Sequence, residues 1–270
     1  EYTACCPFHN EKTPSFTVSE VKQFYYCFGC HARGNAIGFL MDYEHLSYID
    51  AIETLAADQH LDIPYEQGTF NNQNKEDKQP YYDILIKASE LFQAQLKSSD
   101  RAVDYLKQRG LTGEIAKKFK IGYAPDGWGF LTEALGKSSE GLNAFTKTVL
   151  IVTNDNNKTY DRFRDWIIFP ITDQRGRIIG FGGRILDQGE PKYLNSPENT
   201  VFHKGLELYG LYETKQALRK IDRILVVEGY MDVVALAQNG IEYAVASLGT
   251  ATTTEQIQKT FRTTHEIVYC

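Results

Sequence analysis

Four potential metal ligands near the start of the chain restrict its possible folds more than any other feature. Cys6 and His9 form one pair with two residues between them, and Cys27 and Cys30 form a second pair with the same spacing. Each pair fits a tight turn, and three thiolates with one imidazole are a ligand set that suits tetrahedral Zn²⁺. Four protein ligands leave no open coordination position. We therefore expect a structural zinc ion that stabilises a small N-terminal module.

Two neighbouring residues compete with this ligand set. Cys5 adjoins Cys6 and His31 follows Cys30, but the equal two-residue spacings favour Cys6 and Cys30 as ligands. The alternative to a zinc site is a group of buried free cysteines beside a surface histidine. A disulfide framework is disfavoured, because four of the five cysteines lie within the first thirty residues and no secretory signal pattern is found.

The pattern of apolar residues divides the 270-residue chain into four parts. Residues 1–66 combine the ligand cluster with short aromatic strands and one helix. Residues 67–80 are polar and lack periodicity, as in a linker. Residues 81–220 predict a mixed α/β part with helices before and after Gly110 and a later β-hairpin. Residues 221–270 alternate strand, helix, strand, helix and strand, which predicts a parallel sheet.

Local charge matters more than total charge in this chain. The net charge is −6, so no global attraction to nucleic acid is expected, yet basic residues outnumber acidic ones between residues 162 and 204. We expect Arg162 and Arg164 to share one face of a strand, and Arg175 and Arg177 to share another. This pattern favours phosphate binding, although a solvated surface is the alternative.

A glycine-rich run precedes the next arginine. The sequence Gly-Phe-Gly-Gly-Arg ends at Arg184, and glycines of this kind let a backbone approach a ligand closely. In the N-terminal module, Lys12, Lys22 and Arg33 lie among aromatic residues. Exposed aromatic rings beside basic side chains bind unpaired bases and phosphates, whereas the alternative is that these rings form the core of the module.

Two carboxylates follow the first strand of the predicted parallel sheet. Glu228 ends the strand, Gly229 allows a turn, and Asp232 lies one turn into the helix. Residues i and i+4 face the same side of a helix, so both carboxylates are expected at one edge of the sheet. Such oxygen ligands suit Mg²⁺. The alternative is an ordinary acidic helix N-terminus, where carboxylates complement the helix dipole.

Motifs along essentially the whole chain resemble those of bacterial DnaG-type DNA primases. The stretches that carry the resemblance are Cys-Pro-Phe-His-Asn-Glu-Lys-Thr-Pro-Ser-Phe (6–16), Tyr-Cys-Phe-Gly-Cys (26–30), Arg-Phe-Arg (162–164), Ile-Phe-Pro-Ile (168–171), Gly-Phe-Gly-Gly-Arg (180–184), Pro-Lys-Tyr-Leu-Asn-Ser-Pro-Glu (191–198), Phe-His-Lys-Gly (202–205) and Val-Glu-Gly-Tyr-Met-Asp (227–232). The resemblance implies an α+β multidomain protein. Its parts are a zinc ribbon (1–66), a linker, a basic mixed α/β lobe (81–220) and the start of a toprim βαβαβ unit (221–270).

The resemblance also implies a function. Such an enzyme is a nucleotidyltransferase that makes short RNA primers on single-stranded DNA from ribonucleoside triphosphates during DNA replication. Its zinc ribbon helps to select the template start site, and Mg²⁺ or Mn²⁺ at the toprim acids serves two-metal phosphoryl transfer. A C-terminal domain binds the replicative helicase. We therefore expect a cytoplasmic protein at the replication fork that has no membrane association.

Matching the motifs residue by residue assigns roles by resemblance. Glu228 is the leading catalytic and magnesium-binding acid, with Asp232 beside it. Arg162 and Arg164 are expected to follow the template backbone. The remaining residues expected to contact nucleic acid or nucleotide are Arg109, Arg184, Lys192, Tyr193, Asn195 and Lys204, with Lys12, Lys22 and Arg33 in the zinc ribbon.

The chain departs from the family pattern in two respects. The Asp-x-Asp acids of the family are expected shortly after the last strand, but the sequence ends at Cys270, so we expect a fragment that is inactive by itself. His31 replaces the glycine expected after the second cysteine pair. Two other functions remain open, namely a toprim nuclease, which cuts DNA without ribonucleotides, and a non-catalytic zinc-ribbon protein that binds single-stranded DNA.

Overall fold

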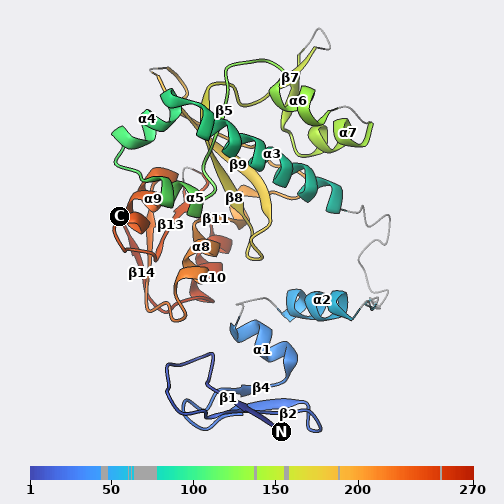
Figure 1. The fold of residues 1–270 in the computed structure, drawn as a ribbon, viewed down its shortest axis with the longest axis vertical. Coiled ribbons are helices and arrows are strands. Elements are labelled where there is room, and N and C mark those ends of the chain that lie inside the picture. Colours follow the sequence, from blue (N-terminus) through green and yellow to red (C-terminus); the bar gives the residue numbers. More distant parts are fainter. Residues whose placement is uncertain are drawn as a thin grey trace. The chain divides into compact units, whose positions relative to one another are not determined.

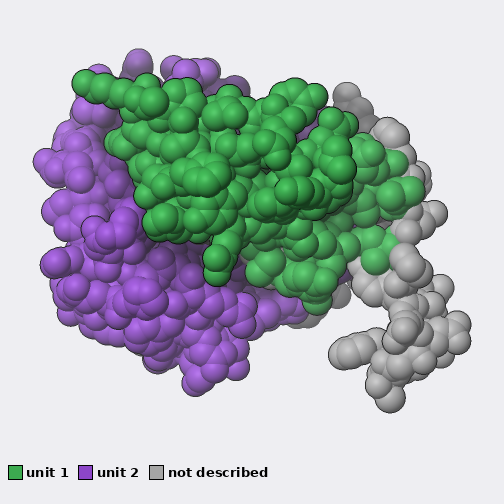
Figure 2. All heavy atoms as spheres, turned by 90° about the horizontal axis from the view of Figure 1, so that it is seen from below, with its two compact units in different colours: residues 1–75 green, residues 76–270 purple. Residues whose placement is uncertain are grey.

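The computed structural model describes two compact units, residues 1–75 and residues 76–270 (Figure 2). The described residues are 1–43, 48–59, 61, 63, 78–136, 139–154, 158–187, 189–249 and 251–270. Most of the expected linker, residues 67–77, lies outside them. Each unit has a hydrophobic core of its own, so each is described by itself.

The first unit is a small antiparallel sheet followed by two helices. The four strands are neighbours in chain order, β1 (Tyr2–Ala4), β2 (Phe16–Ser19), β3 (Phe24–Cys27) and β4 (Arg33–Gly34), and the helices are α1 (Ala36–Tyr43) and α2 (Tyr48–Asp58). Side chains alternate across β2 and β3, which buries Phe16 opposite Cys27 in the register. The expected zinc-ribbon fold is therefore confirmed.

Aromatic rings form the core of this unit. The rings of Phe8, Phe16, Tyr25 and Phe39 lie within 5.2–6.2 Å of one another, centroid to centroid. Offset and edge-to-face packing at such distances adds to the effect of burial alone. The core remains small, which is why a unit of this size needs the support of a metal or a comparable cross-link.

The second unit begins with helix α3 (Gln79–Ser98), which lies across an antiparallel sheet (Figure 1). The strands of this sheet, in spatial order, are β10 (Tyr193–Asn195), β9 (Ile178–Ile185), β8 (Trp166–Thr172) and β5 (Gly122–Ala124). Strands β8 and β9 form the expected hairpin. Helix and sheet approach closely at Gly122, where a Cβ atom would lie 2.5 Å from Phe92.

Shorter elements surround this sheet. They are α4 (Asp100–Gln108), α5 (Gly113–Lys118), α6 (Phe130–Leu135), α7 (Ser139–Lys147), β6 (Ile151–Thr153) and β7 (Thr159–Asp161). Helices α4 and α5 flank Gly110 as expected, with Ser99 and Thr112 as their N-caps. Asp161 is buried and accepts hydrogen bonds from the backbone N–H groups of Leu131 and Thr132, so β7 holds the start of α6.

A second sheet completes the unit and confirms the predicted alternation of strands and helices. Its strands, in spatial order, are β11 (Leu208–Tyr209), β13 (Ala244–Ser247), β12 (Ile224–Val227) and β14 (Ile267–Tyr269). Its helices are α8 (Leu211–Ala217), α9 (Tyr230–Gln238) and α10 (Thr254–Phe261). Strands β12, β13 and β14 are parallel, whereas β11 pairs antiparallel with β13. Among the described residues, none of the helices combines the length and apolar character needed to cross a membrane.

The glycine-rich run of β9 has a different role from the one expected. A Cβ atom at Gly182 would lie 2.5 Å from the ring of Tyr230, and one at Gly183 would lie 3.0 Å from the rings of Phe163 and Trp166. The glycines therefore make room for aromatic rings of the protein. The expectation that this run lets the backbone approach a ligand was wrong, because sequence alone does not show what packs against a glycine.

The two expected arginine pairs do not lie in strands. Arg162 and Arg164 follow the end of β7 on either side of buried Phe163. Arg175 and Arg177 lie in the turn between β8 and β9. The strand prediction was wrong at these positions because alternating charge resembles a strand pattern even where the backbone turns.

Candidate functional site

The four expected zinc ligands lie together in the first unit. The ligand atoms of Cys6, His9, Cys27 and Cys30 are all within 4.8 Å of one another. The Sγ atoms of Cys6 and Cys30 are 3.7 Å apart, and Cys27 Sγ lies 3.8 Å from His9 Nδ1. A tetrahedral zinc ion with bonds of about 2.0–2.3 Å requires such separations, of roughly 3.5–3.8 Å. The donor set therefore fits structural zinc.

The two buried thiols of the cluster differ in pKa. Burial alone raises the pKa of the Cys27 thiol, but its hydrogen bond with the Ser15 hydroxyl and those from the backbone N–H groups of Cys30 and Gly29 outweigh it and lower the pKa to about 6. Burial raises the pKa of the Cys6 thiol to about 11. Zinc binding stabilises the thiolate form of such ligands and releases their protons.

Glu11 supports the cluster from outside the ligand set. Its carboxylate lies 3.2 Å from His9 Nε2 and accepts a 2.7 Å hydrogen bond from the backbone N–H of Cys6. Ser15 donates to it from both its N–H and its Oγ, and the Oγ bond is the main cause of the lowered pKa of Glu11. A carboxylate on one imidazole nitrogen orients the other toward a metal. Glu11 was not among the functional residues expected from the sequence, although it follows His9 by only two residues.

The two competing residues take no part in the cluster. Cys5 is exposed, and His31 accepts or donates a 3.0 Å hydrogen bond with the hydroxyl of Tyr26. His31 has φ = +62°, in the left-handed region that favours glycine. A glycine, as expected at this position, would adopt the same backbone conformation without strain.

Basic residues of the first unit lie at its surface. Lys12, Lys22 and Arg33 are exposed. Of the aromatic residues around the cluster, Phe8, Phe16 and Tyr25 pack in the core, whereas Phe24 and Phe28 are 40% and 69% exposed. Phe28 packs edge-on against Tyr26, with ring centroids 4.9 Å apart. These exposed rings are available for contacts with unpaired bases.

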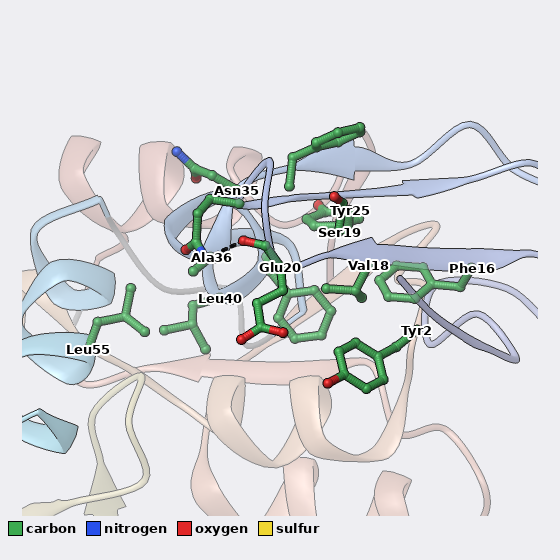
Figure 3. Close-up of a pocket in the computed structure, with 13 residues that line it drawn as sticks. Tyr2, Phe16, Val18, Ser19, Glu20, Tyr25, Asn35, Ala36, Leu40 and Leu55 are labelled. Atoms are coloured by element: carbon green, nitrogen blue, oxygen red, sulfur yellow. Dashed lines mark hydrogen bonds between the residues drawn. The ribbon is translucent and has the colours of Figure 1, made fainter.

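An apolar cavity of about 480 Å³ opens on another part of this unit. Figure 3 shows Tyr2, Phe16 and Val18 of the sheet and Leu40 and Leu55 of the helices along its wall. None of the four zinc ligands lines it. The cavity is therefore a feature separate from the metal cluster.

In the second unit, three of the expected phosphate-binding residues line one polar cavity of about 700 Å³. These are Arg109, Arg184 and Lys192. Arg184 donates to the hydroxyls of Tyr105 and Tyr193, and its guanidinium lies 4.7 Å from the Tyr193 ring centroid. Asp187 and Glu190 also line the cavity, so its charged side chains are three basic and two acidic ones, and Asp187 is paired with Arg101 outside the lining. The arginines and the lysine are the groups on this lining that suit a phosphate.

A second cationic surface involves Arg164. Its guanidinium lies 4.0 Å from the ring centroid of Trp128 and 4.7 Å from that of Tyr160. Trp128 is 67% exposed, so the three side chains form an open aromatic and cationic platform. Arg162 instead donates to the carbonyl of Val149, and burial lowers its pKa. Trp128 was not among the functional residues expected from the sequence, although a tryptophan between two glycines in a polar segment is a usable signal.

The two acids of the parallel sheet lie at its carboxyl edge. Glu228 is exposed directly after β12, and no hydrogen bond or ion pair involves its carboxylate among the described residues. Asp232 accepts a 3.1 Å hydrogen bond from the backbone N–H of Gly229, so it caps helix α9. Within the described part of the chain, no third carboxylate joins them in a cluster. Glu228 therefore fits a single oxygen ligand for a hard cation such as Mg²⁺.

Asn195 joins the basic lobe to this edge. It accepts a 2.6 Å hydrogen bond from the hydroxyl of Tyr230 and donates a 3.0 Å bond to the carbonyl of Leu248. The end of strand β10, which begins at Tyr193 directly after Lys192, is therefore bonded to the start of α9 and to the residue after β13. The amide of Asn195 is occupied by these structural bonds.

The last expected basic residue, Lys204, begins the 3₁₀-helix η1 (Lys204–Leu206). The carboxylate of Glu198 accepts 2.8 Å hydrogen bonds from the Lys204 backbone N–H and from His203 Nδ1. The His203 bond is the main cause of the lowered pKa of Glu198. The loop that carries Lys204 is thus ordered by its own acidic residue.

Models of three known protein families match successive stretches of the chain. The family described as CHC2 zinc finger, of the DnaG zinc-ribbon type, matches residues 1–71. The DNA primase catalytic core, N-terminal domain, matches residues 91–215, and the toprim domain matches residues 222–270. The three matches follow one another without overlap.

Individual proteins agree with these matches. The chain is 55% identical to a DNA primase of Pseudomonas aeruginosa and 50% identical to that of Escherichia coli K12, in each case over its full length. It spans 41% and 47% of those two proteins, less than half of their length.

Two solved structures resemble the chain. A DnaG primase catalytic domain bound to single-stranded DNA is 48% identical, with a TM-score of 0.70 over 73% of this chain and 64% of the other. The zinc-binding and RNA polymerase domains of the Aquifex aeolicus primase are 36% identical, with a TM-score of 0.67 over 99% of this chain and 65% of the other. With a zinc-ribbon cluster, a basic lobe and a toprim sheet in this order, the chain belongs to the DnaG-type DNA primase family.

Proposed function

We propose that the protein synthesises short RNA primers on single-stranded DNA from ribonucleoside triphosphates, as a nucleotidyltransferase of DNA replication. The observation that carries this proposal is the link through Asn195, which bonds both Tyr230 and the Leu248 carbonyl. It joins the end of β10, three residues after Lys192, to Tyr230, two residues after Glu228. A phosphate-binding surface and a metal-binding acid at one edge are what phosphoryl transfer requires.

The proposal assigns the charged residues separate tasks. Arg109, Arg184 and Lys192 bind phosphates of the nucleotide or the primer in the polar cavity, and Lys204 adds a further positive charge. Glu228 is the metal ligand, and Asp232 keeps the turn of Glu228 in place through its cap on Gly229. Bound Mg²⁺ or Mn²⁺ supplies activation of the primer 3′-hydroxyl and neutralisation of the triphosphate charge.

Template contacts are proposed on the platform of Arg164, Trp128 and Tyr160. A base stacks on the exposed Trp128 ring while the guanidinium meets the backbone phosphates. Both arginines are half-buried and donate to backbone carbonyls, Arg162 to that of Val149 and Arg164 to that of Asp161. Because Arg164 also stacks on the exposed Trp128 ring, we assign the larger share of the template contact to Arg164. One solved relative is described as bound to single-stranded DNA, which supports a DNA template in general.

The remaining roles follow the expected division of the chain. Residues 1–66 select the template start site through Lys12, Lys22, Arg33 and the exposed rings. Residues 67–80 link this part to residues 81–220, which supply phosphate contacts. Residues 221–270 hold the metal. The replicative helicase is the proposed partner of the whole protein. The proposal places it at the replication fork in the cytoplasm.

Replacing Glu228 tests the proposal. In the full-length protein, Glu228→Gln should lower RNA synthesis on single-stranded DNA about a hundredfold or more, because metal charge stabilisation is worth several kcal/mol. The matched control is Glu255→Gln, since Glu255 is also exposed and lies in the first turn of α10. DNA binding should be unchanged in both variants.

Other results would select another function. Unchanged synthesis in Glu228→Gln would remove Glu228 from the mechanism. Cleavage of DNA without ribonucleotides would indicate a toprim nuclease, and metal-dependent binding without synthesis would indicate a non-catalytic zinc-ribbon protein.

A further inference from the structure

The helix turn that carries Lys204 has little stability of its own. Element η1 is a 3₁₀-helix of three residues, and such short helices have poorer hydrogen-bond geometry than α-helices. None of its residues is buried. The position of Lys204 must therefore be fixed by groups outside η1. These groups belong to helix α10 with its N-cap and to the loop residue Glu198.

Gln256 of helix α10 supplies two of these bonds. Its Nε2 donates to the carbonyl oxygen of Lys204 at 2.9 Å and to that of Glu207 at 2.7 Å. Its Oε1 accepts from the backbone N–H of Thr253 at 3.0 Å. The residue is 0% exposed. Both amide hydrogens and the amide oxygen are thus occupied, and the side chain cannot reach a ligand.

Two further contacts join the same helix to the same loop. Thr253 Oγ1 donates to the carbonyl oxygen of Gly205 at 2.6 Å. Lys259 Nζ pairs with the Glu207 carboxylate at 2.7 Å, and both side chains are largely buried. With the Gln256 bonds, α10 contacts the backbone or side chain of residues 204, 205 and 207. The carboxylate of Glu198 accepts a hydrogen bond from the backbone N–H of Lys204, whereas Gln256 bonds the carbonyl of the same residue.

We propose that Gln256 is a positioning residue for phosphate binding by Lys204. It fixes both ends of η1, so the Lys204 side chain starts from a single backbone position. An ordered backbone at Lys204 reduces the conformational entropy that is lost when its long, flexible side chain binds a ligand. This inference rests on the phosphate-binding role proposed for Lys204, and it adds a residue of the toprim helix that makes no contact with the substrate.

The experiment combines variants of both residues in the full-length protein. Gln256→Met keeps the length of the side chain and removes its hydrogen bonds. The matched control is Gln258→Met, because Gln258 is exposed on the same helix. Lys204→Ala and the double variant Lys204→Ala with Gln256→Met complete the cycle. The readout is kcat/KM for ribonucleotide incorporation, with the melting temperature of each variant.

A positioning role predicts a non-additive result. Gln256→Met should lower kcat/KM roughly fivefold, within the range of coupling found for residues of one network. In the Lys204→Ala background the same change should have almost no further effect. Gln258→Met should behave as the unchanged protein. Amide hydrogen exchange of residues 204–207 should be faster in Gln256→Met.

Three results would overturn the inference. Additive losses in the double variant would mean that Gln256 acts through general stability. A normal kcat/KM in Gln256→Met with a reduced value in Lys204→Ala would show that Lys204 needs no positioning. A normal value in Lys204→Ala would instead refute the proposed role of Lys204 itself, together with the inference built on it. Should Gln256→Met not fold, Gln256→Asn retains the amide, shortens its reach and is read by the same cycle.

Discussion

At the residue scale, one missing Cβ atom allows the zinc cluster to form. A Cβ at Gly29 would lie 2.6 Å from His9 Nε2 and 2.9 Å from Ser15 Oγ. Both atoms belong to the hydrogen-bond network around Glu11. The sequence shows Gly29 between the two cysteines, but only the fold shows that the space beside it holds the imidazole. Spacing predicted the ligands, whereas their supporting contacts required coordinates.

Gly29→Ala should therefore weaken zinc binding. The added methyl group displaces His9 or Ser15, and loss of such supporting contacts typically lowers metal affinity roughly tenfold to a hundredfold. The measurement is the rate of zinc transfer to a chromogenic chelator. Gly38→Ala is the matched control, because a Cβ there would meet a single atom, Asn35 Oδ1, at 3.5 Å. Equal zinc release from the two variants would contradict this account.

At the element scale, the predicted and observed structures differ mainly in short segments. The β8–β9 hairpin was predicted from two β-rich runs on either side of a turn sequence, and the helices around Gly110 were predicted from residues that start helices. Elements α6, α7, β6 and β7 were not predicted, since each is short and depends on tertiary contacts such as the buried Asp161. These elements position the ring of Tyr160 and the Arg164 that follows. Part of the candidate template surface therefore lies in the segment whose secondary structure the sequence predicted least well.

Trp128→Ala tests that surface. Removing a stacking ring should weaken binding of single-stranded DNA by about 1–3 kcal/mol. Fluorescence anisotropy with a labelled oligonucleotide at fixed salt concentration provides the measurement. Phe261→Ala is the control, because Phe261 is a 53% exposed ring at the end of α10, outside the platform. Equal affinities for both variants would place the template elsewhere.

At the scale of the whole molecule, the chain consists of two compact units with separate cores. The core of the first is small and aromatic, so its stability depends on the metal. The second has two four-stranded sheets, which are joined by the contacts of Asn195 with Tyr230 and Leu248, and the two-stranded sheet of β6 and β7. The four zinc ligands all belong to the first unit.

Removal of zinc should therefore unfold the first unit and leave the second folded. Cys27→Ser, or chelation of the metal, should abolish the unfolding transition of the first unit in calorimetry while the transition of the second keeps its midpoint. Cys5→Ser is the matched control, since Cys5 is exposed and outside the cluster. A single transition that shifts as a whole in Cys27→Ser would show that the two units unfold together.

The sequence by itself determined the features that depend on local spacing. Two turns of fixed length predicted the four zinc ligands, two β-rich runs around a turn sequence predicted the hairpin, and alternating strands and helices predicted the parallel sheet. Only the tertiary structure decided which distant groups meet. Gln256 contacts a carbonyl 52 residues away, Asn195 one 53 residues away, and the glycines of β9 receive aromatic rings. Spacing encodes contacts within a turn or a helix, whereas contacts between elements depend on how whole faces pack, which no local pattern specifies.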